Sequence, residues 1–270
     1  MTMESAKSAA QAGPPAPPAG DPARRAGDPA PPAGASEPAA PPKEAHAGGS
    51  EAQTEFAGVL FDMDGLLVDS EPLWFEVECG VAARLDGNWS ETDQQALIGG
   101  SLPRTVSYLL DRAAKPASRE EVARWLVEGM TALLASRELT TMPGARELLA
   151  QVRAAGVPYA LVTSSERPIM DAVLARLGEQ FTATVCADDV RRGKPDPEPY
   201  LRAAALLGVD PRSCVALEDS PNGVASAQAA GCQVVAVPSL VPIPAQPGRV
   251  IAASLADVDL AMLRRLVAGG

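Results

Sequence analysis

The sequence predicts an α/β fold, a Rossmann-like parallel sheet core with helices on both faces and an inserted all-helical cap subdomain. Three observations predict it. Short apolar runs alternate with helical patterns through the second half of the chain. A long helical block without a convincing strand follows the first apolar run. The first fifty residues contain no aromatic residue and no Leu, Ile or Val, so the core must come from the rest of the chain.

The first strand is expected at residues 56–61 (FAGVLF), a short apolar run that leads into Asp-Met-Asp-Gly. Ser70 could cap the helix that follows, which has Pro72 in its first turn. Ser118 opens a capping-box pattern at a later helix. The helices of this block are expected at residues 71–85, 101–114 and 118–136. We therefore predict a cap at residues 71–138 over the carboxyl edge of the sheet, where ligands bind in open α/β folds.

From Pro143 onward, strands and helices alternate, and most of the helices end at a glycine, which commonly follows a helix. The strands are expected at residues 157–163, 183–187, 214–217, 233–237 and 250–252. The helices are expected at residues 144–154, 167–177, 198–207, 222–229 and 258–267. Parallel strands joined in this way need right-handed crossovers and helices on both faces. The core is therefore predicted to comprise residues 56–70 and 139–270.

Residues 1–55 form a Pro/Ala-rich segment that we expect to be disordered. Eleven of the 26 prolines fall within the first fifty residues. A segment of this composition cannot bury enough apolar surface to offset the entropy lost on ordering.

Composition excludes several classes of function. A net charge of −11 leaves no general electrostatic footprint for nucleic acid. No apolar run approaches the roughly 20 residues that span a bilayer, and the N-terminus has no secretory signal pattern. The cysteines are widely spaced, which favours free thiols in a reducing compartment; they are Cys79, Cys186, Cys214 and Cys232. We therefore expect a cytoplasmic monomer without nucleic-acid or membrane partners.

The only histidine, His46, lies in the Pro/Ala-rich segment. Chemistry in the folded body must therefore use carboxylates, hydroxyls, lysine or backbone amides. Four polar clusters supply these groups: Asp62–Gly65, Thr163–Ser165, Gly193–Asp196 and Glu218–Ser220. Each alone could be an ordinary turn or a helix cap. Because parallel strands end at one edge of a sheet, we expect the four clusters to meet there and form a site.

The residues of these clusters follow a specific order along the chain: Asp62-Met-Asp64-Gly65, Thr163, Lys194 and Glu218-Asp219. In that order they resemble the motifs of the haloacid dehalogenase superfamily of phosphotransferases, over about residues 56–270. Two longer strings, DMDGLLVDSEPLW at 62–74 and GKPDPEPY at 193–200, are similar to its sugar-phosphate phosphatase and β-phosphoglucomutase branch. That branch carries a helical cap inserted after the first motif.

Charge balance predicts a metal ion at the site. Four carboxylates and a phosphate ester would repel one another strongly unless a hard cation and Lys194 compensate them. Oxygen ligands without histidine favour Mg²⁺. The resemblance implies that the carboxylates of Asp62 and Asp219 and the backbone carbonyl of Asp64 hold it. Glu218 is expected to be a further ligand, directly or through water.

Asp62 and Asp64 are the predicted catalytic carboxylates. Asp62 ends a strand, so its rigid position suits a nucleophile that attacks phosphorus and forms an aspartyl-phosphate. Asp64 lies two residues further on, where its side chain starts on the same face of an extended chain. It is suited to protonate the leaving alkoxide and then to deprotonate the attacking water.

The other predicted site residues hold the phosphate. Gly65 lets the chain turn and bring amide N–H groups near the phosphoryl oxygens. The Thr163 hydroxyl and the Ser164 N–H would bind the phosphate. Lys194 would hold both the phosphate and the nucleophile as a point charge. Thr163 and Lys194 are therefore grouped with the catalytic residues.

Two cap residues are predicted to contact the substrate. Trp74 lies on the first cap helix, where it could equally pack between cap and core. Arg104 could reach sugar hydroxyls or phosphate in the cap. Glu71 could reach the substrate, although a solvated helix start is the simpler interpretation.

We expect a Mg²⁺-dependent phosphatase that acts on a small phosphorylated metabolite, a sugar or polyol phosphate. The alternative is a phosphomutase of the β-phosphoglucomutase kind. The resemblance implies that such mutases have a histidine on the first cap helix, where this chain has Trp74. Dehalogenases lack the second aspartate, and a phosphonatase would need a better-placed cap lysine than Lys115. A non-catalytic binding protein is disfavoured because the expected catalytic residues are all present.

Overall fold

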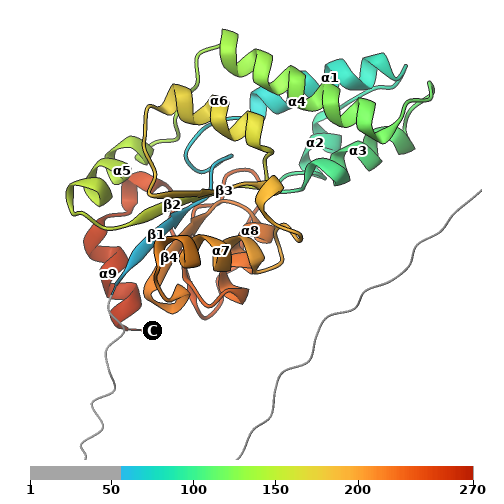
Figure 1. The fold of residues 1–270 in the computed structure, drawn as a ribbon. Helices are drawn as coiled ribbons and strands as arrows, with labels where there is room; N and C mark the ends of the chain where they lie inside the picture. Colours follow the sequence, from blue (N-terminus) through green and yellow to red (C-terminus); the bar gives the residue numbers. More distant parts are fainter. Residues whose placement is uncertain (1–55, 270) are drawn as a thin grey trace, which may run out of the picture. The chain divides into compact units, whose positions relative to one another are not determined.

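The computed structural model describes residues 56–269, and the expected disorder of residues 1–55 lies outside them. Within this range the core is a six-stranded parallel sheet in the order β3-β2-β1-β4-β5-β6 (Figure 1). The strands are β1 Gly58–Phe61, β2 Tyr159–Val162, β3 Ala183–Val185, β4 Cys214–Glu218, β5 Gln233–Ala236 and β6 Arg249–Ile251. The predicted parallel sheet is confirmed. Among residues 56–269, no helix combines the length and the apolar character that a bilayer crossing requires.

The residues of each strand alternate between two apolar clusters, because successive side chains point to opposite faces of the sheet. Val59 and Phe61 pack in the cluster that includes α5, α6 and α9, whereas Leu60 packs with α7 and α8. These helices are α5 Ala145–Ala154, α6 Arg167–Leu177, α7 Glu198–Leu207, α8 Pro221–Ala229 and α9 Leu260–Ala268. Helices therefore cover both faces, which explains why every residue of β1, β2 and β4 is buried.

The strand register brings three of the polar clusters to one level. Phe61 pairs with Leu161 of β2 and with Leu217 of β4. Asp62 extends the ladder by one residue, because its N–H donates to the Leu217 carbonyl at 3.1 Å. The residues just beyond these strands therefore share the carboxyl edge of the sheet.

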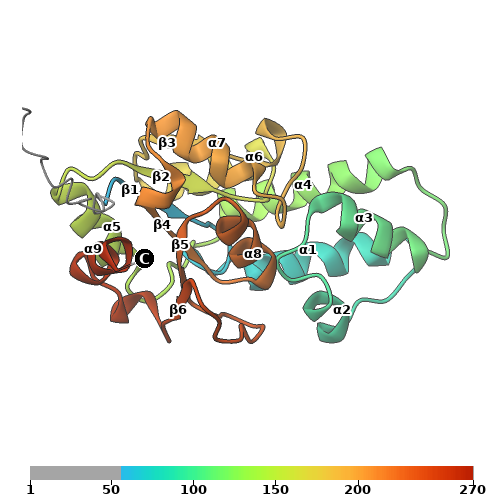
Figure 2. The same cartoon turned by 90° about the horizontal axis from the view of Figure 1, so that it is seen from below.

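The cap consists of α1 Glu71–Arg84, α2 Glu91–Gln95, α3 Leu102–Asp111 and α4 Arg119–Ser136. These helices lie together at one end of the sheet in both views (Figures 1 and 2). Buried side chains of α1 and α4, such as Val77 and Met130, join the apolar cluster of the core. The predicted all-helical cap subdomain is confirmed, while its limits at residues 71 and 138 stay a prediction.

The helix α2 was not expected from the sequence. It has only five residues, too few for an apolar period, and none of them is buried. Its start is fixed by a capping box in which Ser90 and Asp93 exchange hydrogen bonds. The capping box at Ser118 is confirmed, and there Glu121 is the partner.

Some predicted boundaries differ from the structure for local reasons. The first strand begins at Gly58 instead of Phe56. The last helix begins at Leu260 because the Asp259 side chain accepts from the N–H of Met262 and so caps it there. Ser70 occupies the N-cap position of α1, but its side chain makes no capping bond. Its hydroxyl instead donates a hydrogen bond to Asp64 at the carboxyl edge of the sheet.

Candidate active site

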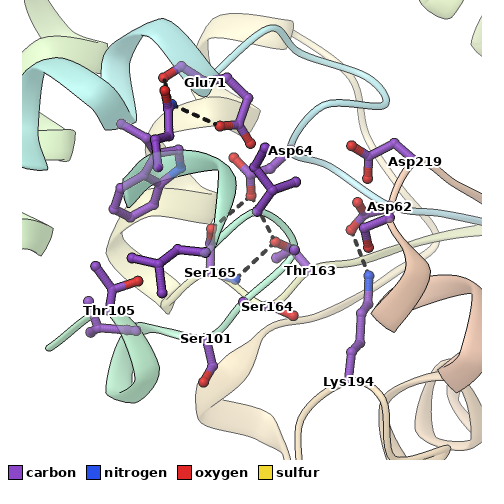
Figure 3. Close-up of a pocket in the computed structure, with 18 of the residues that line it drawn as sticks. Asp62, Asp64, Glu71, Ser101, Thr105, Thr163, Ser164, Ser165, Lys194 and Asp219 are labelled. Atoms are coloured by element: carbon purple, nitrogen blue, oxygen red, sulfur yellow. Dashed lines mark hydrogen bonds and ion pairs between the residues drawn. The ribbon is translucent and has the colours of Figure 1, made fainter. Parts of the chain in front are cut away.

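Lys194 joins the first, third and fourth clusters. Its Nζ donates to Asp62 Oδ1 at 2.6 Å (Figure 3). It also donates to Glu218 Oε1 at 2.6 Å and to the Val162 carbonyl at 2.8 Å. An ammonium group has three donors, and these three hydrogen bonds use all of them. Burial acts to lower the pKa of Lys194, but the two carboxylates raise it above its ordinary value. Lys194 is therefore a fixed positive charge that positions the Asp62 carboxylate.

Asp62, Glu218 and Asp219 form an acidic cluster whose carboxylate oxygens lie within 4.8 Å of one another. All three residues are buried. Burial and then the charge of Glu218 raise the pKa of Asp62, and burial and then the charge of Asp62 raise that of Asp219. Within residues 56–269, Lys194 is the only base paired with this cluster, which leaves an excess of negative charge. Buried oxygen donors with excess negative charge fit a hard divalent cation.

Glu218 is held by residues that the sequence analysis missed. The hydroxyl of Tyr200, on α7, donates to Glu218 Oε1. The carboxylate lies against the first turn of α8, where a Cβ at Gly223 would come within 1.8 Å of Glu218 Oε2. Only glycine leaves room for the carboxylate there. The string at 193–200 therefore supplies Tyr200 as well as Lys194.

Asp64 is surrounded by hydroxyl donors. Its carboxylate accepts from Ser70 Oγ at 2.6 Å, from Ser165 Oγ at 2.8 Å and from Thr163 Oγ1 at 3.2 Å. The N–H of Ser165 in turn donates to Thr163 Oγ1 at 3.0 Å (Figure 3). This network fixes the Asp64 carboxylate at the pocket wall, outside the acidic cluster. Ser70 and Ser165 are part of motifs noted in the sequence, but their bonds depend on the folded chain.

Gly65 is required by the backbone. It has a φ of +75°, and a Cβ there would lie 2.2 Å from Asp219 Oδ2. Its own N–H closes a turn by donating to the Val68 carbonyl at 2.9 Å. The backbone N–H groups of Asp64 and Ser164 have no acceptor among residues 56–269, and both residues line the pocket. These two amides are therefore available to an anion.

The pocket lies between the sheet edge and the cap. From the cap it is lined by Glu71, Trp74 and Glu78 of α1, by Gln94 of α2 and by residues 97–102 and Thr105. Trp74 lines the pocket and also packs against the apolar core, so its two interpretations are compatible. Arg104 does not line the pocket, and its exposed guanidinium donates to the Ala96 carbonyl at 2.7 Å.

Ser239 is a further residue that the sequence analysis missed. Its Oγ donates to Asp219 Oδ2 at 2.6 Å, from the loop after β5. No motif marks this serine, because only the order of the strands brings its loop beside Asp219. Ser239 therefore positions the Asp219 carboxylate.

The sequence and the fold match those of known proteins. A family model described as haloacid dehalogenase-like hydrolase matches residues 56–231. Hexitol phosphatase B of Escherichia coli (strain K12) is 35% identical over 221 residues, which cover 77% of this chain and 93% of that protein. The chain therefore belongs to the haloacid dehalogenase-like hydrolases, as its motifs predicted.

Two solved structures are similar to this fold. CbbY from Rhodobacter sphaeroides, in complex with phosphate, has a TM-score of 0.71 and 27% identity, covering 77% of this chain and 99% of CbbY. A putative β-phosphoglucomutase from Thermotoga maritima has a TM-score of 0.59 and 30% identity, covering 74% of this chain and 95% of that one. The expected enzyme class, a phosphoric monoester hydrolase, agrees with the family and with the phosphatase name among its relatives.

Proposed function

We propose that the chain is a Mg²⁺-dependent phosphatase that hydrolyses a small sugar or polyol phosphate through an aspartyl-phosphate intermediate. The observation that carries the proposal is the placement of the Asp62 carboxylate. Its Oδ1 is bonded to Lys194, and its Oδ2 has no hydrogen-bond partner among residues 56–269. This oxygen is available for attack. The similarity to hexitol phosphatase B supports the substrate class.

In the first step, Asp62 Oδ2 attacks phosphorus, and the bond between phosphorus and the ester oxygen breaks. Asp64 donates a proton to the leaving alkoxide, so the alcohol departs neutral. The hydroxyls of Ser70, Ser165 and Thr163 hold the Asp64 carboxylate in place for this transfer. Splitting hydrolysis in this way replaces one difficult step with two easier ones.

In the second step, Asp64 takes a proton from water, and the resulting hydroxide attacks the phosphorus of the aspartyl-phosphate. Asp62 is released as a carboxylate, and inorganic phosphate leaves. The free N–H groups of Asp64 and Ser164 would bind the phosphoryl oxygens in both steps, and the Lys194 ammonium, whose three donors are in use, would stabilise them through its charge.

The donor set of the acidic cluster fits Mg²⁺. Asp62, Asp219 and the backbone carbonyl of Asp64 would hold the ion. Glu218 would contribute through Oε2 or a water, because its Oε1 is already bonded to Lys194 and Tyr200. A bound Mg²⁺ supplies the positive charge that the cluster and the phosphate ester lack.

The test is turnover of 4-nitrophenyl phosphate by the purified chain with Mg²⁺, compared with an Asp62→Asn variant. An amide cannot act as the nucleophile, so we expect a loss of at least about 10³-fold in kcat with the circular dichroism spectrum unchanged. Asp69→Asn is the matched control, because Asp69 is exposed and makes no side-chain hydrogen bond among residues 56–269. Activity in Asp62→Asn within tenfold of the unmodified chain would refute the role of Asp62.

A further inference from the structure

Among residues 56–269, the cap wall of the pocket contains no base. In this part of the chain, six acidic residues and one basic residue, Lys194, line the pocket. The acidic residues are Asp62, Asp64, Glu71, Glu78, Glu166 and Asp219. Lys194 belongs to the sheet edge and already contacts two carboxylates. A phosphate bound at the sheet edge would therefore have the pocket's single ammonium, and a second anion on the same substrate would have none.

Bases of the cap are held elsewhere. Arg104 bonds to the Ala96 carbonyl, Arg112 stacks on the ring of Tyr108, and Arg84 lies over the ring of Trp125. None of these three arginines lines the pocket. A second anionic group on a substrate would thus be desolvated without a compensating charge, which is costly.

Two glutamates of α1 have raised pKa values, which shows that negative charge is unfavourable at this wall. Burial, and then the charge of Asp64, raise the pKa of Glu71 to about 7. Burial, and then the charge of Glu71, raise the pKa of Glu78 to about 8. The surroundings disfavour negative charge on the protein's own carboxyl groups. A carboxylate or second phosphate of a ligand would meet the same surroundings.

The same wall offers groups that can form hydrogen bonds with a hydroxylated ligand. Glu78 is 5% exposed, and its Oε2 accepts from Trp89 Nε1 at 3.1 Å. Its Oε1 has no partner among residues 56–269 and belongs to a side chain that lines the pocket. The hydroxyls of Ser101 and Thr105 are also without partners in that range and line the pocket. Figure 3 shows Ser101, Thr105 and Glu71 across the pocket from Asp62, Asp219 and Lys194.

The spacing of the two glutamates along α1 sets the length of the cap wall. Glu71 and Glu78 are seven residues apart, which corresponds to about 10 Å along a helix at 1.5 Å per residue. Glu71 lies at the start of α1, and Glu78 lies two turns further on. The wall is thus long enough to follow a chain of several hydroxylated carbons away from the phosphate.

We propose that Glu71 and Glu78 make the cap selective for phosphomonoesters whose remainder is neutral and rich in hydroxyl groups, and that they reject substrates with a second anionic group. This inference rests on the proposed function, because it concerns the leaving group of the same reaction. Glu78 Oε1 accepts from a substrate hydroxyl. A carboxylate or second phosphate at that place would meet buried glutamates and no base, and the repulsion grows as both glutamates ionise with rising pH.

The test compares two esters of the same six-carbon chain, D-glucitol 6-phosphate and 6-phospho-D-gluconate. They differ only at carbon 1, which is a neutral hydroxymethyl group in one and a carboxylate in the other. At pH 9, where both glutamates are ionised, we expect kcat/KM to favour the neutral ester by at least about 30-fold, equivalent to about 2 kcal/mol. At the same pH the Glu71→Gln/Glu78→Gln variant should narrow that ratio of kcat/KM values by at least about fivefold, because it removes both charges. Glu76→Gln is the matched control on α1, since Glu76 is exposed and paired with Arg137 outside the pocket.

The outcomes separate the two claims. Absence of turnover with every ester, 4-nitrophenyl phosphate included, would refute the proposed function and this inference with it. Turnover of 4-nitrophenyl phosphate with equal kcat/KM for the two six-carbon esters, or with neither accepted, would overturn this inference alone. A ratio that is large but unchanged in the double variant would also overturn it, because the glutamates would then not be its cause.

Discussion

At the scale of single residues, the carboxyl groups around the pocket differ in how their negative charge is balanced. Glu218 has Lys194 and Tyr200 as donors, and Asp64 has three hydroxyl donors. Among residues 56–269, Glu78 has one donor, the indole N–H of Trp89. Since Glu78 is buried, as Glu218 is, whereas Asp64 is only half-buried, the charge of Glu78 is the least compensated of these. This difference has a measurable effect on stability.

We expect Glu78 to make the fold less stable as pH rises. Its pKa is raised from 4.5 to about 8, mainly by burial. A carboxyl with a higher pKa in the folded chain contributes stability below the unfolded pKa, and that stability is lost as pH rises toward the folded pKa. The loss therefore falls between about pH 4.5 and pH 8, and is on the order of a few kcal/mol. Glu78→Gln should raise Tm by several degrees at pH 8 and by little at pH 5.

The measurement is Tm by calorimetry at both pH values, with Glu76→Gln as the control on the same helix. Glu76 is exposed, so its substitution should shift Tm by little at either pH. An equal shift for Glu78→Gln at pH 5 and pH 8 would contradict the titration of Glu78.

At the scale of elements, the sequence predicted what depends on local pattern. The helices at 167–177 and 198–207 match α6 and α7, because a proline in the first turn and a glycine after the last turn define their ends. The helix α2 was not predicted, because no apolar period follows its capping box. In the site, Asp62, Glu218 and Asp219 come from motifs. Tyr200 and Gly223 position Glu218, and Ser239 positions Asp219. These contacts exist only once the strands are ordered.

The packing of α1 on α4 predicts opposite effects for two glycines in these helices. Gly80 in α1 has nothing within 4 Å of the place where a Cβ would lie, so Gly80→Ala should stabilise the protein by about 0.5–1 kcal/mol. Gly129 in α4 faces Val77, and a Cβ there would lie 2.9 Å from Val77 Cγ1. Gly129→Ala must push the helices apart or displace Val77, which is buried in the core.

We therefore expect Tm to rise for Gly80→Ala and to fall for Gly129→Ala. Thermal unfolding of the two variants beside the unmodified chain measures this. Both substitutions change helix propensity in the same way. The difference between their Tm values therefore measures the effect of the contact between α1 and α4. A Gly129→Ala variant as stable as Gly80→Ala would show that the two helices do not pack this closely.

At the scale of the whole molecule, the sheet edge gathers its negative charge from chain segments more than 150 residues apart. Asp62 follows β1, while Glu218 and Asp219 come from the end of β4. The neighbouring places of β1 and β4 in the sheet make this meeting unavoidable. A cation that binds there thus links two halves of the core, and it should affect stability as well as activity.

We expect EDTA to abolish turnover, Mg²⁺ to restore it and Ca²⁺ to restore it poorly. Mg²⁺ requires octahedral geometry at about 2.0–2.1 Å, whereas Ca²⁺ is larger and takes 6–8 ligands. Mg²⁺ should also raise Tm of the chelated protein, since a ligand that binds the folded state stabilises it. The same titration with Asp219→Asn should show a smaller rise in Tm. Full turnover after exhaustive chelation would refute dependence on a metal.

Hydrolysis can be distinguished from transfer of the phosphoryl group to a second hydroxyl by the products. A phosphomutase must keep its phosphoenzyme from water until a sugar phosphate returns, and its bisphosphate intermediate carries two anionic groups. Within the described residues 56–269, the cap wall offers no base to the second phosphate, and Trp74 has no proton to exchange near neutral pH. Asp64 is therefore expected to take a proton from water as readily as from a sugar hydroxyl. Incubation with β-glucose 1-phosphate and a trace of the 1,6-bisphosphate should release inorganic phosphate, if it reacts, and form little glucose 6-phosphate. Rapid formation of glucose 6-phosphate without phosphate release would overturn the phosphatase proposal in favour of a mutase.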